Sequence, residues 1–296
     1  MTALSPFFAF FHLGEEAKMT IDLGMSTILT ASTILVLLTA STTITDEIEG
    51  RTALTMLSKP LRREEFLIGK YLGIACAGCA FVALMAIVLL TTLRSQRYIG
   101  EVQDPNFPLG VGLAVLIGVG LFTVLTTLRL LLNRGLPMVS AFWVAYVSAS
   151  IFLLVFLGIK APAQTVWEWR LIPGLISICL HACVVAAVAV ALATRLTLVQ
   201  SAIGTAAFCV LGHASSALVG PFRTSENELT VLGHVLRAIL PDLDQFNNTD
   251  ALATAFIEKP ISIPWDVLAG STIYALLYGI VLMAVASALF SRRELA

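Results

Sequence analysis

Long apolar runs separated by shorter polar stretches dominate the chain. The hydrocarbon core of a bilayer, about 30 Å thick, takes about 20 apolar residues in a helix. Seven segments meet or approach that length, namely residues 25–44, 71–93, 109–132, 138–159, 172–194, 198–220 and 266–290. Backbone amides in lipid must be hydrogen-bonded within the protein, which favours helices. The pattern therefore predicts an all-α, polytopic transmembrane helix bundle, with residues 1–296 forming one transmembrane domain.

The composition agrees with this pattern. Of the 296 residues, 58% are hydrophobic and 12% are charged, whereas about 25% of the residues of a soluble domain are charged. The composition therefore predicts a multi-pass protein surrounded by membrane lipid. A net charge of −1 without a concentrated basic face gives no support for a nucleic-acid partner.

The distribution of basic residues predicts the orientation of the spans. Residues 45–70, between the first two spans, hold five Lys and Arg, and such loops favour the cytoplasm. Alternation then places further basic residues on the same side: Arg129, Arg134, Arg195, Arg292 and Arg293. Seven spans with a cytoplasmic C-terminus leave the N-terminus outside. We therefore expect either a translocated N-terminus or an eighth helix upstream of this chain.

The five cysteines lie inside apolar runs. Cys76 and Cys79 have the C-x-x-C spacing of redox and metal sites, and Cys179 and Cys183 share a helix face. His181, two residues from each of the latter, faces the other side of that helix. No further histidine or carboxylate nearby completes a ligand set. We interpret the cysteines as small packing residues and predict no metal site.

The spans hold few ionisable groups, although proton relays and ion paths usually need several. The candidates are His181, His213 and Arg129. We interpret the histidines as hydrogen-bonded packing residues, and Arg129 as a residue that extends to the membrane surface. The sequence contains no H-E-x-x-H, P-loop or G-x-S-x-G motif. We predict no catalytic residue and no bound cofactor, and expect any energy for transport to come from elsewhere; an intramembrane enzyme is disfavoured.

The longest segment outside the predicted spans covers residues 221–265. Apolar residues recur there at helical spacing before Pro241: Leu229, Leu232, Val235, Leu236 and Ile239. The pattern predicts an amphipathic helix at the outer membrane interface. Two interpretations stay open, a lid over a substrate exit and a helix that only covers the bundle.

Residues 45–70 carry the most charge in the chain. Glu47 and Arg51, four residues apart, have a favourable helical order. Lys59-Pro60 then interrupts the helix, because the residue before a proline is pushed toward extended conformations. Pro60 is tolerated in the first turn of a new helix. We predict two short helices that meet at a proline corner, and the segment is either an interfacial loop or a docking surface for a soluble partner.

The motif order in this segment carries a family resemblance. "DEIEGRTALTMLSKPLRREEFLIGKYLG" resembles the first cytoplasmic segment of ABC transporter permeases of the type-2 exporter class. That segment has an acidic pair, an arginine, an L-S-K-P corner, an apolar run and Gly-Lys. Within that class, the segment is most similar to the nitrous-oxide-reductase maturation and gliding-motility permeases. The resemblance covers residues 45–73, with support from "LPDLDQFN" and "FSRREL".

The resemblance implies a coupling element that sits in a cleft of an ABC ATPase subunit, which binds ATP and Mg. The implied coupling residues are Glu47, Glu49, Arg51, Leu57, Lys59, Pro60, Arg63, Phe66 and Lys70. It also implies a second permease copy or homologue, the bacterial cytoplasmic (inner) membrane, and a family helix set one span larger than the seven found here. The alternative is a non-transporting membrane scaffold that recruits a cytoplasmic partner through residues 45–70.

Overall fold

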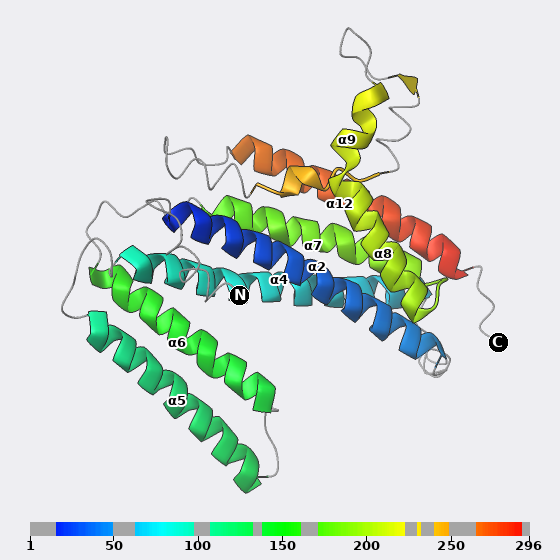
Figure 1. The fold of residues 1–296 in the computed structure, drawn as a ribbon. Helices are drawn as coiled ribbons and strands as arrows, with labels where there is room; N and C mark the ends of the chain where they lie inside the picture. Colours follow the sequence, from blue (N-terminus) through cyan, green and yellow to red (C-terminus); the bar gives the residue numbers. More distant parts are fainter. Residues whose placement is uncertain are drawn as a thin grey trace. The chain divides into compact units, whose positions relative to one another are not determined.

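Apolar runs of the predicted lengths form helices in the structure, a computed structural model (Figure 1). The structure describes residues 16–49, 63–97, 107–132, 138–160, 171–222, 230–231, 240–248 and 265–291. Within these ranges the secondary structure consists of α-helices and short 3₁₀ turns, and no β-strand occurs. The all-α prediction is therefore confirmed for the described part of the chain.

Each predicted span except residues 198–220 lies in a helix of similar or greater length. The long helices are α2 (Glu16–Glu49), α4 (Arg63–Arg97), α5 (Phe107–Leu132), α6 (Met138–Lys160), α7 (Ile172–Ala193), α8 (Leu198–His213) and α12 (Trp265–Ser291). The shorter elements are α9 (Ser215–Val219), η4 (Gly220–Phe222) and η5 (Asp244–Phe246). The helices α2 and α4, with 34 and 35 residues, extend beyond the apolar runs that predicted them.

The described helices indicate a multi-pass membrane protein. Five have the length and hydropathy needed to cross a membrane: α2, α4, α5, α7 and α12. A sixth span is possible if α8 and the segment Ser215–Phe222, which meet at 63°, count as one. The predicted count of seven spans is not confirmed. The described apolar part of α6, Val144–Phe156, is shorter than the helices that could cross a membrane. Residues 198–220, predicted as one span, are bent at Ala214.

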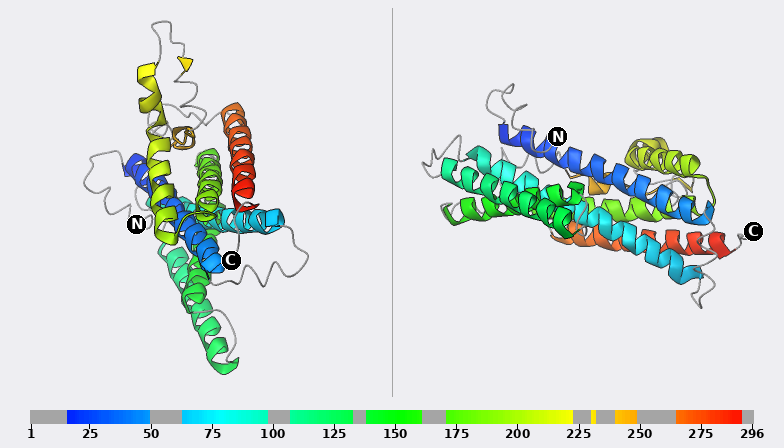
Figure 2. Two further views of the ribbon diagram at one scale, coloured as in Figure 1. Left: turned by 90° about the vertical axis from the view of Figure 1, so that its right-hand side faces the viewer. Right: turned by 90° about the horizontal axis from the view of Figure 1, so that it is seen from below.

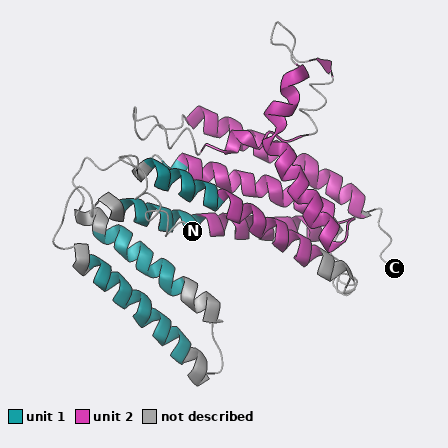
Figure 3. Ribbon diagram, in the orientation of Figure 1, with its two compact units in different colours: residues 1–28, 83–172, 251–262 teal, residues 29–82, 173–250, 263–296 magenta. Residues whose placement is uncertain are grey.

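The chain forms two compact units (Figure 3), and α2 and α4 contribute to both. Unit 1 comprises residues 1–28, 83–172 and 251–262. In this unit a Cβ added to Gly118 of α5 would lie 3.2 Å from the Cβ of Ala149 in α6. The Thr91 hydroxyl of α4 donates a hydrogen bond to the Ser150 carbonyl of α6 at 3.2 Å. Small residues thus let α5 and α6 approach closely.

Unit 2 comprises residues 29–82, 173–250 and 263–296. Helix α7 lies between α8 and α12 (Figure 2), and 72% of its most apolar window is buried. Its sequence "VVAAVAVALA" is rich in small side chains, which let neighbouring helices pack against it from several sides. Gly78 of α4 packs close to Val36 of α2 and Ala182 of α7. Unit 2 therefore has a core built on α7, and it holds the described parts of the predicted coupling segment.

Candidate functional site

The described residues of the predicted coupling segment are the ends of two long helices. Glu47 and Glu49 lie in the last turn of α2, and Arg63 is the first residue of α4. Phe66 and Lys70 lie in the first turns of α4. The other implied coupling residues, Arg51, Leu57, Lys59 and Pro60, lie outside the described residues.

The sequence predicts two short helices that meet at a proline corner within residues 45–70. In the structure α2 continues to Glu49 and α4 begins at Arg63, each without a break from its span. The physical reason on the α4 side is a continuous buried stripe, because Leu67 and Ile74 both pack into the unit 2 core. The predicted proline corner itself lies outside the described residues. The first turns of α4 thus continue directly into a membrane span.

Phe66 joins the start of α4 to the end of α12. Its ring stacks on Phe290 with centroids 6.2 Å apart and an interplanar angle of 20°. Phe290 is 2% exposed, so it is an anchor rather than a surface residue. The Lys70 ammonium lies 5.8 Å from the Phe66 ring centroid, within the range of a cation–π interaction. The sequence gives no signal that pairs Phe66 with Phe290, because more than two hundred positions separate them.

Arg195 adds the α7–α8 turn to the same end of unit 2. Its guanidinium donates a hydrogen bond to the Leu289 carbonyl of α12 at 2.6 Å. A cation at this position satisfies a carbonyl that the helix leaves unpaired, and it complements the negative end of the helix dipole. The start of α4, the α7–α8 turn and the end of α12 therefore lie together, as the predicted alternation of spans requires.

A hollow of about 560 Å³ lies beside Phe66. It is lined by residues of α2 and α4: Thr39, Thr43, Glu65, Phe66, Gly69, Lys70, Gly73 and Ile74. Both charge signs and two threonines occur among them. This hollow and the stacked phenylalanines make the junction of α2, α4 and α12 the candidate functional site.

The segment "LPDLDQFN", predicted in an outer loop, is largely built into unit 2. Leu243 and Phe246 have no exposed surface. The backbone N–H of Asp242 donates to the Tyr274 hydroxyl of α12 at 3.0 Å, and the Ser215 hydroxyl donates to the Asp242 carboxylate at 3.4 Å. These partners satisfy polar groups that would otherwise be costly to bury. The amphipathic pattern before it, at Leu229, Leu232, Val235, Leu236 and Ile239, lies outside the described residues.

The two histidines of unit 2 lie next to each other near this segment. The ring centroids of His181 in α7 and His213 in α8 are 5.3 Å apart, in an edge-to-face arrangement. His213 Nδ1 lies 3.1 Å from the Cys209 carbonyl, one helical turn away. His181 has no exposed surface, and within the described residues neither of its ring nitrogens has a hydrogen-bond partner. Both histidines pack between helices as predicted, but the prediction of a hydrogen bond is wrong for His181.

Three of the five cysteines meet where α4 packs against α7. Cys79 Sγ lies 3.7 Å from Cys183 Sγ, and it donates to the Cys179 carbonyl at 3.9 Å. Within the described part of the chain, no group of three or more His, Cys, Asp or Glu has the geometry of a metal site. The cysteines therefore join two helices of the core by sulfur contacts.

No protein-family model, curated protein or solved structure matches this chain. A function must therefore be inferred from the residues and contacts described above.

Proposed function

We propose that this chain is the membrane-spanning permease subunit of an ATP-driven ABC exporter of the type-2 class. It would couple ATP hydrolysis on a separate ATPase subunit to transport across the bacterial cytoplasmic (inner) membrane, in a complex with a second permease copy or homologue. The observation that carries the proposal is the charged Lys59-Pro60 segment between α2 and α4, with its resemblance to a permease coupling element.

The contacts of unit 2 support a mechanical role for this segment. It ends directly at the first turn of α4, where Phe66 stacks on Phe290 of α12. The end of α12 is in turn hydrogen-bonded to Arg195 in the α7–α8 turn. A displacement of residues 50–62 by an ATPase subunit would therefore act directly on α2 and α4, and through α4 on α12 and the α7–α8 turn. Packed helices rearrange between discrete states rather than deforming continuously, which suits a transport cycle.

The proposal also assigns ATP and Mg to the partner subunit. The sequence of this chain has no phosphate-binding loop. The acidic and basic residues of the segment, among them Glu49, Arg51 and Arg63, would bind the ATPase through complementary charges. Such contacts set specificity and register more than affinity.

Co-purification with charge-reversed variants tests the proposal. The tagged chain is purified from its native membrane, and associated proteins are identified by mass spectrometry. We expect an ABC-type ATP-binding subunit with the wild type and with Lys259→Glu, on the predicted opposite face. We expect it to be lost from Arg51→Glu and Arg63→Glu. The proposal fails if no ATP-binding subunit co-purifies and none is encoded beside this gene. A bound partner whose ATPase activity is not stimulated by any substrate in reconstituted membranes would favour the scaffold alternative.

A further inference from the structure

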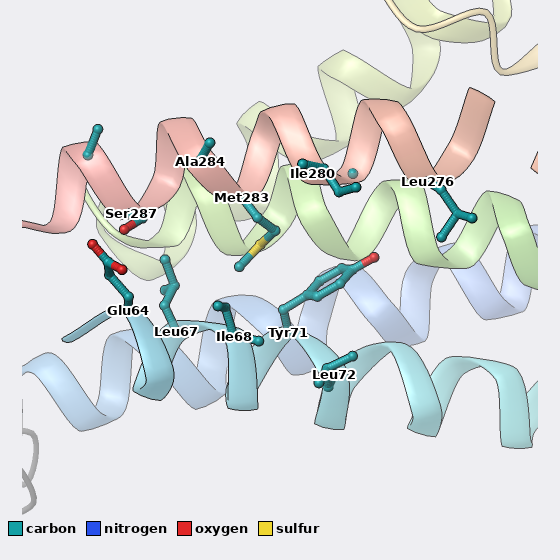
Figure 4. Close-up of a pocket in the computed structure, with 12 residues that line it drawn as sticks. Glu64, Leu67, Ile68, Tyr71, Leu72, Leu276, Ile280, Met283, Ala284 and Ser287 are labelled. Carbon is teal, nitrogen blue, oxygen red and sulfur yellow. The ribbon is translucent and has the colours of Figure 1, made fainter. Parts of the chain in front are cut away.

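A groove runs between α4 and α12 in unit 2, with a volume of about 630 Å³ (Figure 4). Its α4 wall repeats at helical spacing: Glu64, Leu67, Ile68, Tyr71 and Leu72. Its α12 wall does the same: Leu276, Gly279, Ile280, Met283, Ala284, Ser287 and Ala288. Two helix faces thus diverge along their length. The small residues of α12 leave the space between them.

The groove has an apolar floor and exposed apolar edges. Leu67 is 1% exposed, and Tyr71 and Met283 are partly buried against the unit 2 core. Leu276 and Ile280 are 60% and 65% exposed and stand on one edge. A surface of this kind is suited to hydrocarbon, and it lies within the parts of α4 and α12 that are apolar enough to cross a membrane.

Two polar side chains of the groove, Glu64 and Ser287, lie at one end, whereas the Tyr71 hydroxyl lies farther along it, 3.5 Å from a Cβ built on Gly279. The exposed Glu64 carboxylate and the Ser287 hydroxyl point toward one another across that end (Figure 4). Glu64 is the first residue of the α4 span, and Ser287 lies three residues from the end of the α12 span. The polar end therefore coincides with a membrane boundary, whereas the Leu72 and Leu276 end lies deeper in the bilayer.

The length of the groove matches one lipid leaflet. Leu276 and Ser287 are 11 residues apart in the sequence, which corresponds to about 16 Å along an α-helix. Half of a bilayer's hydrocarbon core is about 15 Å. A single acyl chain that enters from the boundary would fill the groove to the middle of the membrane.

We propose that this groove binds an amphiphile with a primary ammonium headgroup, as in phosphatidylethanolamine. The acyl chain lies against Leu67, Tyr71 and Met283, and the ammonium group donates hydrogen bonds to the Glu64 carboxylate and the Ser287 hydroxyl. The charge of Glu64 selects this headgroup, because a carboxylate attracts an ammonium group and repels a purely anionic headgroup. The site goes beyond the proposed transport function, since it needs no ATPase subunit.

Lipid retention by the purified full chain tests the site. The chain is exchanged into mixed micelles that contain phosphatidylethanolamine or phosphatidylglycerol with identical acyl chains, and native mass spectrometry counts the retained lipids. We expect preferential retention of one phosphatidylethanolamine per chain. Phosphatidylcholine, whose methylated headgroup has no N–H donor, should be retained less.

Glu64→Gln is the decisive variant, with Glu65→Gln as its matched control. Both carboxylates lie in the first turn of α4 and complement the helix dipole equally, but only Glu64 lines this groove. An exposed ion pair is weak, so we expect Glu64→Gln to lower phosphatidylethanolamine retention by about fivefold. Glu65→Gln should leave it unchanged.

Two results would overturn the site. One is equal retention of phosphatidylethanolamine and phosphatidylglycerol, with no change in Glu64→Gln. The other is occupation of the groove by a second copy of this chain, seen as a disulfide-linked dimer of Ile280→Cys in membranes. Because the purified chain is tested alone, neither result bears on whether an ATPase subunit docks to residues 45–70.

Discussion

Gly78 of α4 lies where three helices of unit 2 meet, and replacing it by alanine tests that packing. A Cβ at this position would lie 2.7 Å from Val36 Cγ2 of α2 and 3.6 Å from the Ala182 Cβ of α7. The second distance is an ordinary contact, but the first is too short. Val36 cannot turn away easily, because a β-branched residue in a helix has one strongly preferred rotamer. Either α2 or α4 must therefore shift.

The size of the effect follows from two opposing contributions. Overpacking a core by a methyl group costs about 1–3 kcal/mol. Alanine also has a higher helix propensity than glycine, by about 1 kcal/mol. Gly73→Ala, five residues earlier in α4, isolates the second contribution because a Cβ there meets nothing within 4 Å. We expect Gly78→Ala to be less stable than Gly73→Ala by about 1–3 kcal/mol.

Thermal unfolding of the purified chain in one detergent measures this difference. Labelling of newly exposed cysteines by a thiol-reactive fluorophore reports the transition. The double variant Val36→Ala/Gly78→Ala should recover part of the loss, with a coupling of about 0.5–3 kcal/mol. Equal midpoints for Gly78→Ala and Gly73→Ala, with no coupling to Val36, would refute the close approach of α2 and α4.

Three further predictions follow from contacts in unit 2. Mild oxidation with copper phenanthroline, which takes one electron from each thiol as its proton is lost, should form a disulfide between Cys79 and Cys183. Peptide mass mapping should detect this disulfide in the wild type and not in Cys183→Ser. Gly212→Leu should displace segment 240–248, because a Cβ there would lie 2.7 Å from Leu243, and proteolysis within that segment should accelerate. Arg195→Ala should lower the free energy of unfolding by less than about 1 kcal/mol. It should also speed hydrogen exchange in the last turn of α12, and unchanged exchange there would contradict the capping hydrogen bond.

The helices could be predicted from the sequence because membrane spans obey a simple constraint. Apolar runs of about 20 residues must be helical in lipid, and each predicted run except residues 198–220 lies in one observed helix. The helix ends were harder to predict. Four of the five residues 45–49 are polar, which predicts the start of a loop helix, but a polar sequence can continue a helix once the preceding turns are formed.

Contacts between distant segments could not be predicted. "LPDLDQFN" holds two aspartates and a glutamine, which favour an exposed loop. Its burial depends on Tyr274 and Ser215, which supply hydrogen bonds from other helices. The bend at Ala214 is similar, because it divides an apolar run that has no proline. The groove beside Glu64 needs the α4 and α12 faces to diverge, and no single-helix pattern records that.

Site-specific photo-crosslinking from residue 59 tests the proposed function most directly. Lys59→p-benzoylphenylalanine is irradiated in native membranes, with the same amino acid at Thr230, on the predicted opposite side, as the control. The proposed function predicts a crosslink from residue 59 to an ABC-type ATP-binding subunit. The crosslink should be lost when that subunit is replaced by a variant that cannot bind this chain. A crosslink only to lipid, or equal labelling of the ATP-binding subunit from both positions, would contradict the proposal.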